Sequence, residues 1–268
     1  MQSPYKDARV AATYDRVAVP HHFVRPARDL IHMLGVVASW RVLDVGAGTG
    51  AATIPAVNSL GPTGSVVALE PSLEMLNVLR RKCTAMPVAG EVPGLPFAGG
   101  VFNAVFACFA LSHTKSVELA LTDMVRVLKP GGRLGVTSWS PNQTEASQLW
   151  RSIATKFVRE ETLAEGYRRF VPWEEWLSDP DRLRQALTQS GLQDVAVSRG
   201  DYPVSISVAD FLAMREASVE GRLLAENLGP QQQAELKRHM IVAFETRFQR
   251  RLEFVREAFL ACGTKRTS

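Results

Sequence analysis

A glycine-rich stretch at residues 42–50 (VLDVGAGTG) is the part of this sequence most able to hold a ligand. An apolar run carrying one acid leads into Gly46, Gly48 and Gly50, which predicts a strand, a tight turn and the start of a helix. Glycines there let the backbone approach a ligand, and backbone N–H groups and the positive end of the helix dipole would point at it. The stretch therefore predicts a binding loop, with a turn that binds nothing as the alternative.

Two acids indicate the kind of ligand. Asp44 stands two residues before the first glycine, and Glu70 ends the second predicted strand. With Ala51 the glycines also fit the dinucleotide pattern G-x-G-x-x-A, but a carboxylate at Asp44 would repel a pyrophosphate. Opposite charges about 4 Å apart attract by about 4 kcal/mol at an effective dielectric of 20, so Asp44 favours a cationic head such as that of S-adenosylmethionine. Glu70 would accept hydrogen bonds from two ribose hydroxyls, which both NAD and S-adenosylmethionine carry. The alternative is a strand-end acid without a ligand.

Later strand ends carry further candidates. Glu91 closes the third predicted strand, where it would accept an adenine amino group while Val92 contacts the ring; a loop carboxylate is the alternative. His113 follows the fourth strand and is a candidate general base, with a structural or cofactor-contacting role as the alternative. Trp139 ends the fifth strand and would line an apolar acceptor pocket, or belong to the core of a lid.

The N-terminal segment supplies three more candidates. His21 and His22 would contact the acceptor, and His22 is also a candidate base. Tyr14 would close over the methionine end of the cofactor, core packing being the alternative. Three cysteines without metal-ligand spacing predict buried thiols rather than disulfides or a metal site.

The predicted elements form an α/β pattern, because short β-rich runs alternate with helical patterns from residue 41 to residue 139. Strands are predicted at residues 41–45, 65–70, 85–90, 103–110 and 133–139, with helices at 74–82 and 116–128. The KPGG at 129–132 would end the second helix and turn the chain into the next strand. Two late strands are predicted at 194–204 and 252–265, with helices between them in 207–245.

The pattern predicts a Rossmann-like, doubly wound, seven-stranded and mostly parallel sheet with a helical N-terminal segment and a helical lid insertion. We expect an N-terminal helical cover at residues 1–40 and a cofactor-binding core at 41–140. A lid insertion would follow at 141–190, and the late strands at 191–268 would enclose a helical insertion at 207–248.

Composition limits the class of protein. The 268 residues are 46% hydrophobic and 22% charged, and no apolar run approaches the roughly 20 residues of a membrane span. The N-terminus lacks the layout of a secretion signal, so we expect a cytoplasmic protein. The net charge of +4 is scattered in short clusters, which argues against a nucleic-acid partner.

Five motifs in order, VLDVGAGTG, ALEPS, GEVPGLPF, ALSHTKSVELALTDMVRVLKPGGRL and LACGTK, resemble those of class I S-adenosylmethionine-dependent methyltransferases. The most similar type is the small-molecule group of ubiquinone and menaquinone biosynthesis methyltransferases. The resemblance covers about residues 10 to 140, and residues 190 to 265 agree only in layout. Two departures are Glu91, where the family usually has aspartate, and Val101-Phe102-Asn103, where it usually has SFD.

The resemblance implies roles for individual residues. The loop residues Asp44, Gly46, Ala47, Gly48 and Gly50 would surround the methionine moiety of S-adenosylmethionine, and Glu70 would bind its ribose. Pro71, Ser72 and Met75 would lie beside the adenosine, Glu91 and Val92 at the adenine, and Phe109 and Ala110 on the sulfonium side.

These observations together predict methyl transfer to O, N or C of a small, apolar or aromatic molecule by in-line displacement, leaving S-adenosylhomocysteine. The alternatives are an RNA or protein methyltransferase, an NAD-dependent oxidoreductase and a non-catalytic cofactor binder. We expect a monomer or a homodimer.

Overall fold

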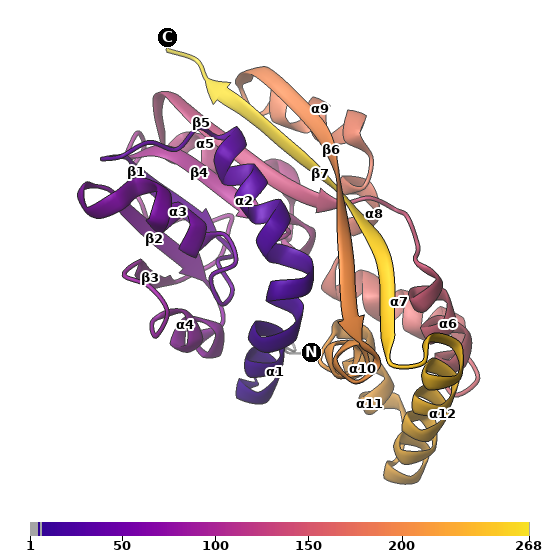
Figure 1. Ribbon diagram of the computed structural model, residues 1–268. Coiled ribbons are helices and arrows are strands. Elements are labelled where there is room, and N and C mark those ends of the chain that lie inside the picture. The colour runs from indigo at the N-terminus through magenta and orange to yellow at the C-terminus, as the bar shows by residue number, and fades with distance from the viewer. Residues whose placement is uncertain (1–4, 6, 268) are drawn as a thin grey trace.

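The computed structural model describes residue 5 and residues 7–267, which form a twisted sheet with helices on both faces and a group of helices beyond one edge (Figure 1). The strands are β1 (Arg41–Val45), β2 (Ser65–Glu70), β3 (Met86–Ala89), β4 (Phe102–Cys108), β5 (Leu128–Trp139), β6 (Leu192–Ser207) and β7 (Arg251–Lys265). The helices around the sheet are α2 (Val24–Met33), α3 (Thr53–Leu60), α4 (Leu73–Leu79), α5 (Val117–Val127), α8 (Glu174–Leu177) and α9 (Pro180–Gln189).

Apart from the short 3₁₀ helices η3 (Gly61–Thr63) and η4 (Leu111–His113), the remaining helices lie at the N-terminus and beyond the sheet edge. They are α1 (Ala8–Thr13), the π-helix η2 (Tyr14–Phe23), α6 (Glu145–Ala154), α7 (Glu160–Phe170), α10 (Val208–Glu216), α11 (Val219–Asn227) and α12 (Pro230–Phe248). Polar side chains cap the N-termini of several helices. The Ser116 side chain accepts a hydrogen bond from the Leu119 N–H, and the Asp179 side chain accepts one from the Asp181 N–H at 2.9 Å.

The strand order, β3-β2-β1-β4-β5-β7-β6, locates the ligand edge of the sheet. The first five strands run parallel, and β7 pairs antiparallel with both β5 and β6. The chain moves outward from β1 to β3 and then returns to place β4 on the other side of β1. Such a reversal opens a crevice at the carboxyl ends of the strands, where ligands bind in doubly wound folds. The predicted seven-stranded, mostly parallel sheet is confirmed.

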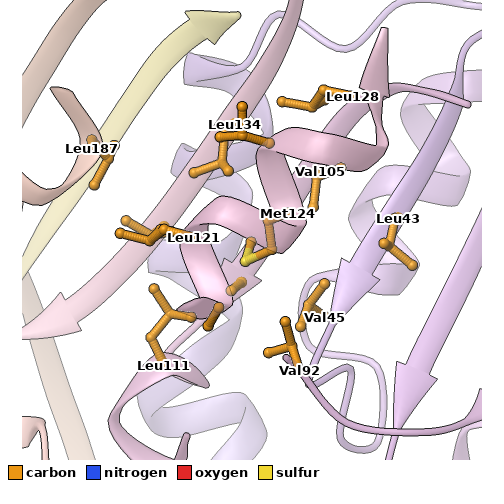
Figure 2. Packing of buried hydrophobic residues seen from close by; sticks show 14 of the residues in the cluster. Leu43, Val45, Val92, Val105, Leu111, Leu121, Met124, Leu128, Leu134 and Leu187 are labelled. Atoms are coloured by element: carbon orange, nitrogen blue, oxygen red, sulfur yellow. The ribbon is translucent and has the colours of Figure 1, made fainter. Parts of the chain in front are cut away.

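Alternate residues of the central strands bury on opposite faces of the sheet. Leu43, Val45 and Val105 pack under Leu121 and Met124 of α5 (Figure 2). The intervening residues of the same strands pack against α2 and α3 on the other face. Because both faces are covered, the strands read as nearly continuous apolar runs, and this is why β1 and β2 have the predicted limits.

The KPGG segment lies inside β5 and does not precede it. β5 starts at Leu128, and its register against β4 shifts between the pairs Phe102–Leu128 and Ala104–Arg133. A bulge formed by the extra residues absorbs the proline and the glycines, Gly131 having a φ of 73°. The start predicted at residue 133 was therefore late.

Helices from two insertions pack together into one group, named the lid helices after the predicted lid insertion. Helices α6, α7, α10, α11 and α12 share an apolar cluster with the outer ends of β6 and β7, which extend past the sheet as an antiparallel ribbon (Figure 1). Helix α9, predicted within the lid at 141–190, instead packs on the sheet through Leu183 and Leu187. The N-terminal helices cross between the sheet and the lid (Figure 1).

Two further observations concern the described part of the chain. Cys83, Cys108 and Cys262 are free thiols of intermediate exposure, so the prediction that they are buried was wrong in degree. Across residues 5 and 7–267, no helix has the length and apolarity needed to cross a membrane.

Candidate active site

A cavity of about 910 Å³ lies at the carboxyl ends of the parallel strands and extends to the lid. It lies where the reversal between β1 and β4 opens the sheet. Small-molecule sites typically occupy about 300–1,000 Å³, so this cavity has room for a cofactor and a small acceptor together.

Most of the predicted site residues line this cavity. They are Tyr14, His22, Gly46, Gly48, Glu70, Pro71, Ser72, Met75, Glu91, Val92, Phe109, Ala110, His113 and Trp139. Three others, Asp44, Ala47 and Gly50, are buried in or beneath the glycine loop and do not line the cavity. His21 lies in a separate surface groove with Arg25 and Glu253, its Nδ1 2.9 Å from the Val17 carbonyl oxygen. The predicted contact of His21 with the acceptor was therefore wrong.

The glycine loop is shaped by its neighbours in the fold. A Cβ atom on Gly46 would overlap that of Ala110, whereas one on Gly48 would meet only the Tyr14 ring, at 3.7 Å. Gly48 is thus the glycine that leaves room for a ligand. The N–H groups of Gly46 and Ala47 donate to the Leu69 carbonyl, and that of Gly48 to Glu70 Oε2 at 3.0 Å. The prediction that these N–H groups point at the ligand was wrong, and the loop offers little to a phosphate.

Asp44 is a buried acid with one unpartnered oxygen. Its Oδ2 accepts a 2.6 Å hydrogen bond from Thr53 Oγ1, while Oδ1 has no partner among the described residues. Burial, reinforced by the charge of Glu70, raises the pKa of Asp44 to about 7 despite the hydrogen bond from Thr53. A positively charged ligand group beside the loop would stabilise the ionised form, so the environment of Asp44 fits the ammonium of S-adenosylmethionine.

Glu70 joins the loop to the start of α4. Its Oε2 accepts from Gly48 N–H, and its Oε1 accepts from Ser72 N–H at 2.9 Å. Burial raises the pKa of Glu70, and these two bonds oppose the rise. Each carboxylate oxygen can accept a second hydrogen bond, so the side chain, which lines the cavity, can still accept from two adjacent hydroxyls. Ser72 caps α4 and donates to the Tyr5 carbonyl at 2.5 Å, so its hydroxyl is already used.

The mouth of the cavity carries an ion pair. Glu91 is 63% exposed, and its carboxylate lies 3.1 Å from Lys115 Nζ. Val92, next to it, is buried. The predicted adenine contact would require Glu91 to turn inward from Lys115, a partner that the sequence analysis missed.

Aromatic side chains form the middle of the cavity wall. Phe109 has a φ of 57°, which is rare for a non-glycine residue, and its N–H donates to Thr137 Oγ1 at 3.0 Å. This backbone holds the Phe109 ring stacked on Trp139, with centroids 3.9 Å apart. Phe23 packs edge-on to Phe109, and Tyr14 lies next to Phe23. Strain stored at a cavity wall is typical of functional sites.

The two candidate bases differ in environment. His113 is open to the cavity, with Nδ1 3.1 Å from the Phe170 carbonyl oxygen. A carbonyl can only accept, so Nδ1 carries the proton and Nε2 is left as an acceptor. The surrounding cavity wall partly desolvates the His113 ring, which lowers the pKa of His113 and favours the neutral ring. For His22, burial and then the charge of Arg256 lower the pKa to about 3, and Nε2 has no partner among the described residues. His22 is therefore the weaker base.

Charged groups at the lid end were missed by sequence reasoning. Tyr167 donates to Glu174 at 3.0 Å, and Arg215 forms an ion pair with Glu220. Arg256 lies with its guanidinium carbon 4.0 Å from the centre of the Trp139 ring. An arginine in the middle of the predicted last strand was the available signal, but nothing in the sequence placed its side chain in the cavity.

The fold and this cavity define a class I S-adenosylmethionine-dependent methyltransferase. The profile of the methyltransferase domain family matches residues 43–136. A demethylmenaquinone methyltransferase of Tropheryma whipplei is 33% identical over 208 residues, covering 71% of this chain and 83% of that protein. The chain belongs to the methyltransferase family that includes this enzyme.

Two more comparisons agree. A ubiquinone/menaquinone biosynthesis C-methyltransferase of Pseudomonas savastanoi is 40% identical over 139 residues, 49% of this chain and 54% of the relative. The phosphoethanolamine N-methyltransferase 2 of Haemonchus contortus, solved with S-adenosylhomocysteine, has a TM-score of 0.58 at 14% identity, over 99% of this chain and 61% of that one. This likeness supports the fold alone. The predicted enzyme class and cofactor are confirmed, and the oxidoreductase alternative is not supported.

Proposed function

We propose that the enzyme methylates a small aromatic or mainly apolar molecule held between the glycine loop and the lid. The observation that carries this proposal is the continuity of the cavity, which runs from Gly48 and Glu70, past the Phe109–Trp139 stack, to the lid helices. The names of the relatives, which refer to demethylmenaquinone, ubiquinone and menaquinone, support an aromatic acceptor.

The proposed cofactor site uses the acids and the loop. Glu70 would accept the ribose hydroxyls, and Gly48 would leave space for the methionine chain. Asp44 would attract the ammonium from behind the loop with its unpartnered oxygen. Met75 and Val92 supply apolar contacts for the adenine, and Tyr14 covers the end of the cavity next to Gly48.

When bound, S-adenosylmethionine supplies an electrophilic methyl group. The work left to the protein is to align the acceptor and exclude water. Phe109 and Trp139 would orient the acceptor ring, and the lid helices would exclude water. His113 would take a proton from the acceptor at Nε2, because Nδ1 is held by the Phe170 carbonyl.

We further propose that residues 41–140 form the cofactor-binding core and that the enzyme acts in the cytoplasm as a monomer or homodimer. Three free thiols support a reducing compartment. Light scattering of the purified protein tests the oligomeric state.

Transfer of a labelled methyl group tests the proposed function. The enzyme is incubated with methyl-labelled S-adenosylmethionine and a complete cell extract, which is then separated into metabolites, RNA and protein. We expect label in the metabolites. Label found only in RNA or only in protein would instead support a macromolecular acceptor and contradict the proposal.

A further inference from the structure

The lid end of the cavity holds an arginine without an anionic partner. Arg256 projects from β7 into the cavity. Within residues 5 and 7–267, no group accepts a hydrogen bond from its guanidinium, and no carboxylate lies within 4.0 Å of it. A guanidinium has five N–H donors in a planar fork, so Arg256 presents several of them to the cavity.

The nearby acids already have partners. Glu174 accepts from Tyr167 at 3.0 Å, and Glu220 pairs with Arg215. Glu174 attracts Arg256 at longer range, and Arg215 repels it. His22, also near this end, stays neutral and adds no negative charge. The protein therefore leaves Arg256 incompletely compensated.

Trp139 holds the guanidinium in place. Phe109 stacks on one face of the Trp139 ring with centroids 3.9 Å apart. Because the Arg256 guanidinium lies 4.0 Å from the ring centre, it must cover the opposite face. Both faces of Trp139 are thus occupied, and an acceptor at this end meets the N–H edge of Arg256 instead.

Partial burial of such a cation in the cavity wall is unfavourable unless a ligand compensates it. Burial lowers the pKa of Arg256 to about 10, the charge of Glu174 opposing this. A desolvated cation without hydrogen-bond partners destabilises the folded protein. The planar fork of a guanidinium matches two oxygens of one carboxylate, or a single oxygen anion, better than any neutral group.

We propose that Arg256 binds an anionic oxygen of the methyl acceptor, either a ring carboxylate or an ionised ring hydroxyl. The acceptor would then be an aromatic acid or phenol, with its charged group at the lid and its ring beside the Phe109–Trp139 stack. This inference rests on the proposed function, since it names the class of molecule that the same cavity receives.

Calorimetry with matched probes tests whether Arg256 binds an anionic oxygen of the acceptor. The enzyme is first saturated with S-adenosylhomocysteine and then titrated with 2-naphthoate, 2-naphthol and the neutral 2-naphthamide. We expect one of the two acidic probes to bind at least tenfold more tightly than the amide, and which one does so distinguishes carboxylate from hydroxyl. Arg256→Met should abolish this preference without changing S-adenosylhomocysteine binding, because Arg256 lies at the lid end.

Arg199→Met is the matched control. Arg199 lies on the neighbouring strand β6, is 56% exposed and is outside the cavity, so its variant should keep the preference. Arg256→Met should also unfold at a temperature no lower than the wild type, because it removes an uncompensated, partly buried charge. Equal binding of the three probes to the wild type, or a preference that survives Arg256→Met, would overturn the inference. Failure of S-adenosylhomocysteine to bind the wild type would instead refute the proposed function.

Discussion

Asp44→Asn should change protein stability and cofactor affinity in opposite directions. The pKa of Asp44 is raised from 3.8 to about 7, chiefly by burial. The folded protein therefore holds this proton more tightly than the unfolded chain. Stability from this group is complete below about pH 4, falls as the pH rises from 4 to 7, and is constant above.

The magnitude follows from that pKa. At about 1.4 kcal/mol for each pH unit between 3.8 and about 7, ionisation of Asp44 removes about 4 kcal/mol of stability. Asparagine cannot ionise, so the stability of the variant relative to the wild type should rise by up to this amount between pH 4.5 and pH 7.5. The amide can still accept the hydrogen bond from Thr53, while its NH₂ group is left without an acceptor, which lowers the variant's stability equally at all pH values.

Cofactor binding should respond in the opposite way. Opposite charges about 4–8 Å apart attract by about 2–4 kcal/mol at an effective dielectric of 20, so Asp44→Asn, which removes the charge behind the loop, should weaken S-adenosylhomocysteine binding by at least about tenfold at pH 7.5. Wild-type affinity should rise with pH as Asp44 ionises, and the variant should show a flatter profile.

Urea denaturation and calorimetry across this pH range measure both effects. Other titrating groups largely cancel in the difference between variant and wild type, apart from Glu70, whose charge interacts with Asp44. A stability difference that does not vary with pH would refute the assigned ionisation. Unchanged affinity would refute the proposed role of Asp44 in binding.

Three other predictions concern the loop and the candidate base. Glu70→Gln should lower stability by about 1–3 kcal/mol in urea titrations, because its NH₂ group must face the N–H of Gly48 or of Ser72; an unchanged midpoint would contradict this. Gly46→Ala should destabilise the protein by about 1–3 kcal/mol more than Gly100→Ala, since the two glycines have similar positive φ values but only Gly46 also meets Ala110; equal losses would refute the steric argument. His113→Ala should lower kcat about 10²–10⁴-fold. Wild-type activity should fall at acid pH as His113 takes up a proton, with a midpoint below 6.5 because desolvation lowers the pKa of His113. The His113→Ala variant should not show this fall, and an unchanged pH–rate profile would exclude His113 as the base.

Local sequence determined much of the cofactor side of the cavity. Strands β1 and β2 have the predicted limits, and the acids near their carboxyl ends, Asp44 and Glu70, lie beside the glycine loop as expected. Both strands are buried on two faces, so continuous apolar runs define them, and the motif residues are close in sequence to the strand ends.

Contacts between distant segments account for the errors. The loop N–H groups are satisfied by Leu69 and Glu70, about 20 residues away, which no local pattern reveals. The π-helix turns His22 into the cavity and leaves His21 outside, a difference that depends on the helix type. Arg256 reaches the cavity only because the long β6–β7 ribbon carries it there.

Calorimetric titration with S-adenosylmethionine, S-adenosylhomocysteine and NAD tests the central claim most directly. We expect one molecule of either adenosyl ligand to bind with micromolar affinity, and no binding of NAD. Gly48→Arg, which would fill the space that Gly48 leaves beside Tyr14, should abolish binding while the circular dichroism spectrum stays native. No binding of S-adenosylmethionine by the intact protein, or equally tight binding by Gly48→Arg, would contradict the assignment of this loop as the site of a methyl donor.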